Sequence, residues 1–150
     1  MNRDGIILAA HRGNRKTAPE NTMPAFEKAI AFGVDMLETD IHMTKDGELI
    51  IMHDRNAART TGHDGLTDQM SFAEIKTLDA GGWFSSDYKN TPVPSVKEFI
   101  NLIKDTPVLI NWELKDYPTE VGDAFAFRAA DQLIALIEEN GLAAHSMLNS

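Results

Sequence analysis

Apolar residues along this chain gather in short runs that alternate with segments of helical spacing. The runs have the length and composition of strands that are buried on both faces of a sheet. They occupy residues 6–10, 34–41, 49–52 and 108–114, and a further run begins at residue 147. We therefore expect four strands and the start of a fifth.

Three segments between these runs are predicted to be helices. Thr22 is a candidate N-cap for the first, whose apolar residues recur at helical spacing until Gly33. Ser95 begins the second with a capping box, and residues 123–139 form the third. The alternation of strands with helices predicts the α/β class.

Residues 55–94 interrupt this alternation. They are polar and rich in Thr, Gly and Asp, and their one helix signal is a capping box that starts at Ser71. A connection of this length is unusual inside a compact domain and often has a function of its own. We therefore expect a functional insertion after the third strand.

Composition limits the classes of protein to which the chain can belong. Its 150 residues suit one domain, and a net charge of -9 argues against binding to nucleic acid or to anionic membranes. There are no cysteines, so disulfides and thiolate chemistry are excluded. No run approaches the roughly 20 apolar residues of a membrane span, and residues 6–10 are too few for a signal peptide. We expect a cytoplasmic protein without stable membrane insertion.

Ionisable side chains lie where the predicted strands end. Four successive strands are closed or followed by such groups: His11, Glu38, Asp40, His53, Glu113 and Lys115. Enzymes of the α/β class build their sites from the carboxyl ends of strands and the loops that follow. Alternate side chains of a strand share a face, so Glu38 and Asp40 point the same way, and the same rule pairs Glu113 with Lys115.

The acidic members of this set indicate a metal site. Two neighbouring carboxylates in a dry site repel each other, and a hard divalent cation removes that repulsion. Glu38, Asp40 and Glu113 offer oxygen ligands that suit Mg²⁺ or Ca²⁺ without distinguishing them. Taken singly, an acidic pair is commonly a solvated surface feature, and a histidine at a strand end is commonly structural. The coincidence over four strands favours a functional site.

The remaining histidines are expected to be structural, although one of them lies close to the acidic pair. They are His42, His63 and His145.

A series of short motifs runs through residues 6–115 in a fixed order. It comprises His11-Arg12-Gly13, Pro19-Glu20-Asn21-Thr22, Glu38-Thr39-Asp40, Thr44-Lys45-Asp46-Gly47, His53-Asp54 and Glu113-Leu114-Lys115. In order and spacing the series resembles the glycerophosphodiester phosphodiesterase family of the bacterial cytoplasmic type. Residues 59–62, 82–84 and 92–94 resemble the insertion that this family carries after strand three.

The resemblance implies a TIM (β/α)8 barrel, of which this chain would supply about the first four to five β/α units. A complete barrel typically has about 250 residues, so residues 1–150 would form one domain that is truncated at its C-terminus. The implied activity is metal-dependent hydrolysis of glycerophosphodiesters, small-molecule substrates that yield an alcohol and glycerol 3-phosphate.

The resemblance also implies which residues bind the metal and the phosphate. One divalent cation, Mg²⁺ or Ca²⁺, would be bound by Glu38, Asp40 and Glu113. The substrate phosphate would be held by Arg12 and Lys115. A metal with an arginine neutralises the anionic oxygens that otherwise repel an attacking nucleophile.

The remaining matches concern proton transfer and support of the site. His11 and His53 would be the general acid and base, because an ordinary histidine pKa of about 6.5 suits either role. Glu20 and Asn21 would support the site. The sequence leaves open which histidine is the acid, and whether the attacking group is water or the substrate's own hydroxyl.

Two other interpretations fit the same motifs. Phosphatidylinositol phospholipases C and phospholipase D toxins use similar barrels, so the substrate would then be a lipid. Alternatively, the chain is an inactive half-barrel that binds metal or phosphate. The open edge of its sheet would favour pairing with another copy, as a homo-oligomer, or with a missing C-terminal half.

Overall fold

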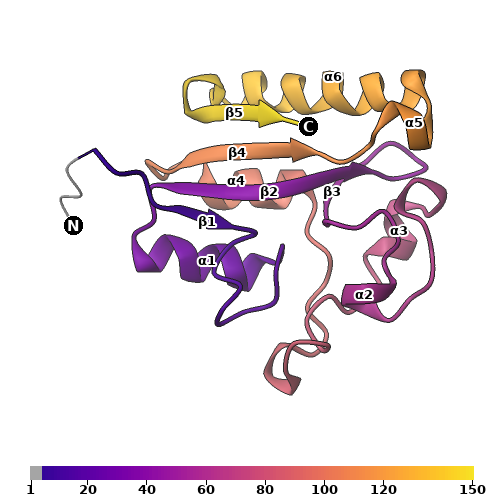
Figure 1. Ribbon diagram of the computed structural model, residues 1–150, viewed down its shortest axis with the longest axis horizontal. Coiled ribbons are helices and arrows are strands. Elements are labelled where there is room, and N and C mark those ends of the chain that lie inside the picture. The colour runs from indigo at the N-terminus through magenta and orange to yellow at the C-terminus, as the bar shows by residue number, and fades with distance from the viewer. Residues whose placement is uncertain (1–4) are drawn as a thin grey trace.

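The computed structural model describes residues 5–150, which form a five-stranded sheet with helices packed along it (Figure 1). Four strands run parallel in the order β1 (Ala9–His11), β2 (Met36–Met43), β4 (Leu109–Leu114) and β5 (Ser146–Asn149). The longer helices between them are α1 (Met23–Phe32), α4 (Val96–Ile103) and α6 (Asp123–Glu139). The predicted α/β class is confirmed.

The two faces of this sheet differ in chemistry. On one face, Leu37 of β2 lies beside Ile110 of β4, and both belong to an apolar core that α1, α4 and α6 complete. Phe99 of α4 packs between Phe26 of α1 and Trp112 of β4, with ring centroids 4.5 and 5.5 Å apart. Because side chains alternate along a strand, the opposite face receives the polar residues of β2 and β4.

Strand β3 (Leu49–Ile51) runs antiparallel to β2, with Ile51 opposite Ile41. The expectation that residues 49–52 form a successive strand of the barrel is therefore wrong. The only link between β2 and β3 is the turn around Gly47, whereas a parallel crossover needs roughly a dozen or more residues. β3 is the returning arm of a hairpin, and the chain supplies four parallel strands.

Several element boundaries differ from the predicted ones. β1 begins at Ala9 rather than at Ile6, and Ile6 and Ile7 are 73% and 57% exposed. β2 continues past Ile41 because its last residues pair with β3 in the hairpin. Helix α6 covers the predicted residues, and β5 confirms the fifth strand.

Local capping explains where the helices begin and end. Ser71 and Ser95 both form complete capping boxes, as predicted, and Gly33 ends α1 in the left-handed conformation with φ of 80°. Thr22 holds the N-cap position of α1, but its hydroxyl donates to the Pro19 carbonyl, 2.7 Å away, instead of capping the helix.

The insertion contains α2 (Ala58–Thr61), η1 (Thr67–Gln69), α3 (Phe72–Ile75) and η2 (Ser86–Tyr88). It packs around a second apolar cluster: Ile50, Met52, Ala57, Met70, Ile75, Ala80 and Val93. The sequence indicated only α3, because a helix of three or four residues is too short to show apolar periodicity.

Two short helices complete the described part of the chain, α5 (Pro118–Val121) and η3 (Ala143–His145). Among residues 5–150, no helix combines the length and the apolar character that crossing a membrane requires.

Candidate active site

The polar face of the sheet brings the acidic residues together at its carboxyl edge. The parallel register places His11 beside Glu38, and Asp40 beside Glu113. β3 returns along β2, so that the Met52 amide donates to the Asp40 carbonyl, 3.1 Å away. His53 therefore reaches this edge from an antiparallel strand.

Glu38, Asp40 and Glu113 form a compact carboxylate cluster. Each offers one oxygen, and these oxygens lie within 4.8 Å of one another. Glu38 and Asp40 are buried, at 7% and 0% exposure. Burial raises the pKa of Glu38 to about 7, and the neighbouring charges of Asp40 and Glu113 add to this effect.

The cluster fits a hard divalent cation. Among residues 5–150, Glu38 Oε1 has no hydrogen-bond partner although it is buried. A buried carboxylate oxygen without a partner is costly, and a cation satisfies it and offsets the repulsion between the three acids. The all-oxygen donor set matches the ligands that Mg²⁺ and Ca²⁺ prefer.

Two cationic side chains flank the cluster. Arg12 Nε lies 3.1 Å from Asp40 Oδ2, and the Arg12 backbone amide donates to Glu38 Oε2 at 2.8 Å. The backbone of Arg12 adopts the left-handed conformation, with a φ of 58°. On the other side, Lys115 Nζ lies 3.3 Å from Asp40 Oδ1 and also contacts Glu113. The predicted phosphate-binding residues therefore contact different oxygens of the Asp40 carboxylate.

The two residues expected to support the site contact these groups directly. Arg12 Nη1 donates to Glu20 Oε1 at 3.0 Å. The Asn21 side-chain amide donates to Asp40 Oδ2 at 2.7 Å and accepts from the Thr39 hydroxyl at 3.3 Å. Glu20 and Asn21 thus fix the positions of Arg12 and Asp40.

Of the two candidate catalytic histidines, His11 lies at the rim of the cluster, and His53 lines a small pocket together with Glu20 and Asn21. His11 Nε2 is 3.8 Å from Glu38 Oε2, and its side chain is half exposed. Burial, followed by the charges of Arg12 and Arg15, lowers the pKa of His11. His53 Nδ1 donates to Asp54 Oδ1 at 2.5 Å, which leaves Nε2 as the other ring nitrogen for proton exchange.

Sequence reasoning missed a buried pair beneath the hairpin. His42 Nδ1 donates to Asp116 Oδ1 at 2.7 Å, and Asp116 Oδ2 accepts from the Met43 amide at 2.7 Å. Both side chains are 1% exposed, in agreement with the structural role expected for His42. Asp116 carried no signal in the sequence because its partner is 74 positions away.

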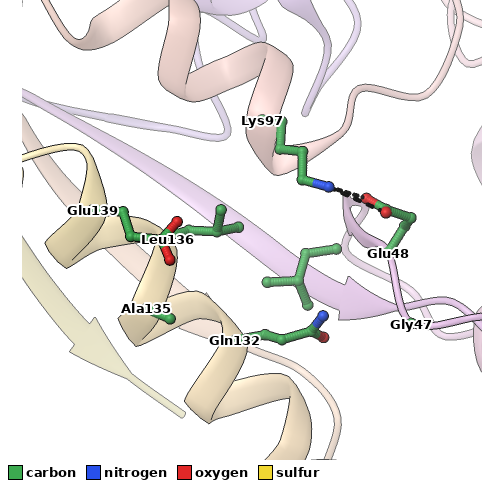
Figure 2. Close-up of a pocket in the computed structure, with 8 residues that line it drawn as sticks. Gly47, Glu48, Lys97, Gln132, Ala135, Leu136 and Glu139 are labelled. Atoms are coloured by element: carbon green, nitrogen blue, oxygen red, sulfur yellow. Dashed lines mark hydrogen bonds and ion pairs between the residues drawn. The ribbon is translucent and has the colours of Figure 1, made fainter.

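A separate pocket of about 230 Å³ lies between the β2–β3 turn, α4 and α6 (Figure 2). The Lys97 ammonium contacts the Glu48 carboxylate at its rim, with a nitrogen–oxygen distance of 2.9 Å. None of the predicted site residues lines this pocket.

A model of the glycerophosphoryl diester phosphodiesterase family matches residues 11–143. The chain belongs to this family. Its relatives include a glycerophosphodiester phosphodiesterase of Caldanaerobacter subterraneus subsp. tengcongensis, 40% identical over 109 residues, which are 73% of this chain and 45% of the relative. A glycerophosphodiester phosphodiesterase of Bacillus subtilis is 43% identical over 91 residues, or 61% of this chain and 31% of the relative.

Solved structures of the family agree with the fold. The glycerophosphodiester phosphodiesterase of Agrobacterium tumefaciens superposes with a TM-score of 0.83 at 30% identity, covering 95% of this chain and 56% of that one. A phosphodiesterase of Oleispira antarctica, solved in complex with the product sn-glycerol-3-phosphate, gives 0.74 at 30% identity, covering 95% and 64%. The chain spans about half the length of the curated relatives it matches, and its fold is part of the TIM barrel of this family.

Proposed function

We propose that the protein hydrolyses glycerophosphodiesters to an alcohol and glycerol 3-phosphate. The observation that carries the proposal is the buried cluster of Glu38, Asp40 and Glu113 between the cations of Arg12 and Lys115. The names of its relatives, and the sn-glycerol-3-phosphate bound to the Oleispira antarctica phosphodiesterase, support the choice of substrate.

The carboxylate cluster would hold one Mg²⁺ or Ca²⁺ ion. When bound, such an ion neutralises charge on a phosphate oxygen. Arg12 and Lys115 would hold the other phosphate oxygens. Because Asp40 and Glu20 already fix the guanidinium of Arg12, little reorganisation accompanies binding.

His11 and His53 would transfer the protons. One imidazole takes the proton of the attacking hydroxyl, and the other gives a proton to the leaving alkoxide. The His53 Nδ1–H bond to Asp54 leaves Nε2 as the exchanging atom of that ring. The position of His11 at the rim of the cluster suits it to contact a substrate phosphate.

The test measures release of glycerol 3-phosphate from glycerophosphocholine. We expect release that chelator abolishes, that Mg²⁺ or Ca²⁺ restores, and that His11→Ala lowers by a factor of at least about 100. Since the chain spans about half of its relatives, the assay is repeated with the C-terminal half of a relative added. Release that is absent in both arms, or indifferent to chelator, contradicts the proposal.

A parallel arm with phosphatidylinositol or phosphatidylcholine vesicles tests the lipid alternative. Hydrolysis of vesicles without hydrolysis of the soluble diester would favour a phospholipase-like enzyme. The matched control for His11→Ala is His63→Ala, because His63 lies on the insertion and is exposed.

A further inference from the structure

A line of hydrogen bonds between alternating basic and acidic side chains connects His53 with Arg12. His53 Nδ1 donates to Asp54 Oδ1, and Asp54 Oδ2 accepts from Arg59 Nε at 2.5 Å. Arg59 Nη2 donates to Glu20 Oε1 at 2.7 Å, and the same Glu20 oxygen accepts from Arg12 Nη1 at 3.0 Å. The sequence assigned no role to Arg59, which is the central member of this line.

Arg59 has the geometry for this position because its guanidinium is a planar fork. Its Nη2 also lies 3.3 Å from Asp54 Oδ1, so one arginine serves two carboxylates that come from separate segments. Although partial burial raises the pKa of Asp54, its hydrogen bonds from Arg59 and His53 lower it below the ordinary value. Asp54 is thereby kept as a carboxylate that accepts from the histidine ring.

Stability alone explains this arrangement poorly. The Arg59 side chain is 44% exposed and Asp54 is 31% exposed, so solvent screens their attraction, whereas Glu20 on the other side of Arg59 is only 10% exposed. Exposed ion pairs of this kind contribute little to folding. What distinguishes Arg59 is that both of its partners hold a residue of the site, His53 in one case and Arg12 in the other.

We propose that Arg59 is a positioning residue that orients His53 through Asp54 and Arg12 through Glu20. This inference rests on the proposed function for its meaning, but its physical content is the orientation of two side chains. A carboxylate oxygen only accepts, so an Asp54 held by Arg59 selects the tautomer of His53 that carries its proton on Nδ1. Without Arg59, Asp54 rotates freely, and the partly exposed His53 ring loses that selection.

The insertion provides a matched control. Arg55 makes a comparable ion pair there, donating from Nε and Nη2 to Asp68 at 2.8 and 3.0 Å. Removal of either arginine breaks one ion pair of the insertion in which Nε and Nη2 bind the same carboxylate. Only the removal of Arg59 disturbs a partner of His53.

The experiment is a long-range ¹H–¹⁵N correlation of the imidazole rings of the 150-residue chain at about pH 8.5, where an ordinary histidine is neutral. His53→Gln identifies the His53 signals. In the wild type we expect His53 to hold its proton mainly on Nδ1. Arg59→Met should shift the proton toward Nε2, whereas Arg55→Met should leave the His53 pattern unchanged.

A backbone amide spectrum verifies that each variant is folded, and Arg59→Gln replaces Arg59→Met if the latter is not. Arg59→Lys, which reaches one carboxylate, should retain part of the wild-type pattern. A His53 pattern that is the same in wild type, Arg59→Met and Arg59→Gln overturns the proposal. An equal change in Arg55→Met overturns it as well.

Turnover gives a second readout. In the assay for glycerol 3-phosphate, we expect Arg59→Met to lower kcat/KM by about 10- to 100-fold, as loss of an orienting outer partner typically does. A fall in kcat with little change in KM would point to His53. Equal values of kcat/KM in Arg59→Met and Arg55→Met would contradict the proposal. If no form releases product, the proposed function fails, and the tautomer of His53 still decides the role of Arg59.

Discussion

The two faces of strand β2 are both buried, but for different purposes. Leu37 and Ile41 lie under the helices in the apolar core, whereas Glu38 and Asp40 lie on the opposite face in the carboxylate cluster. Burial of an aliphatic side chain contributes roughly 1.5–3 kcal/mol to folding. Burial of an incompletely paired carboxylate opposes folding. One strand therefore carries residues whose burial stabilises the fold beside residues whose burial costs stability and forms the carboxylate cluster.

The largest effect on stability is expected on the apolar face. Phe99 is fully buried between Phe26 and Trp112, so Phe99→Ala should lower the free energy of unfolding by about 3–5 kcal/mol in urea denaturation. The control is Phe32→Ala on α1, where the ring is 66% exposed and a change within about 0.5 kcal/mol is expected. Equal losses in the two variants would refute this view of the core.

On the polar face, Glu38→Gln should have the opposite sign. The substitution removes a proposed metal ligand, so calorimetry should detect at least a tenfold (about 1.4 kcal/mol) weaker binding of Mg²⁺ or Ca²⁺. Without metal at pH 8, the free energy of unfolding should stay the same or rise, because a buried charge is removed. Glu48→Gln, at an exposed ion pair with Lys97, should change neither quantity appreciably. If metal-free Glu38→Gln is clearly less stable than the wild type, the buried Glu38 carboxylate stabilises the fold, which contradicts the contrast between the two faces of β2.

The free energy of unfolding should depend on pH through the polar face of β2, where Glu38 lies, and not through its apolar face. The pKa of Glu38 is raised from 4.5 to about 7 in the folded chain, so the folded state binds its proton more tightly than the unfolded state does. Glu38 therefore contributes a loss of stability as pH rises from about 5 to 7, with a slope of at most about 1.4 kcal/mol per pH unit. Above pH 7 this contribution levels off.

Urea denaturation of the metal-free chain across that range measures the slope. Other groups contribute to the total slope, among them His11 with its lowered pKa, so the Glu38 contribution is the difference between the slopes of wild type and Glu38→Gln. The loss of stability with rising pH should be smaller in Glu38→Gln than in the wild type, and unchanged in Glu48→Gln. Since metal binding displaces the same proton, apparent metal affinity should rise with pH up to about 7. A metal affinity that is flat between pH 5 and 7 would exclude Glu38 as a ligand.

The smallest effect is expected at the start of α4, which covers the apolar face. Ser95 caps this helix, so Ser95→Ala should reduce the free energy of unfolding by about 1 kcal/mol and leave metal affinity unchanged. Ser85 caps only the three-residue helix η2, and Ser85→Ala should cost less. Thermal denaturation and calorimetry on both variants test the ranking.

The alternation of side chains allowed much of this division to be predicted. Because side chains two positions apart share a face of a strand, the sequence placed Glu38 with Asp40 and away from the core. Capping boxes likewise located the starts of α3 and α4. These signals are local, and each lies within a few neighbouring residues.

Features that depend on distant partners were not predicted. The direction of β3 does not follow from its apolar run, which looks the same in parallel and antiparallel strands, although the short turn at Gly47 is typical of a hairpin. The sequence identifies Arg59 only as part of a motif. Its partners Asp54 and Glu20 are 5 and 39 positions away, and only the fold brings both to it.

The hairpin also brings the two ends of the insertion together. Residues 55–94 leave the sheet just after β3 and return beside it, where the Ile51 amide donates to the Pro94 carbonyl at 2.9 Å and Ile50 bridges to Ser95. Both ends of the insertion are thus anchored at one strand. A change of length between these two ends therefore does not require the parallel strands to shift their register.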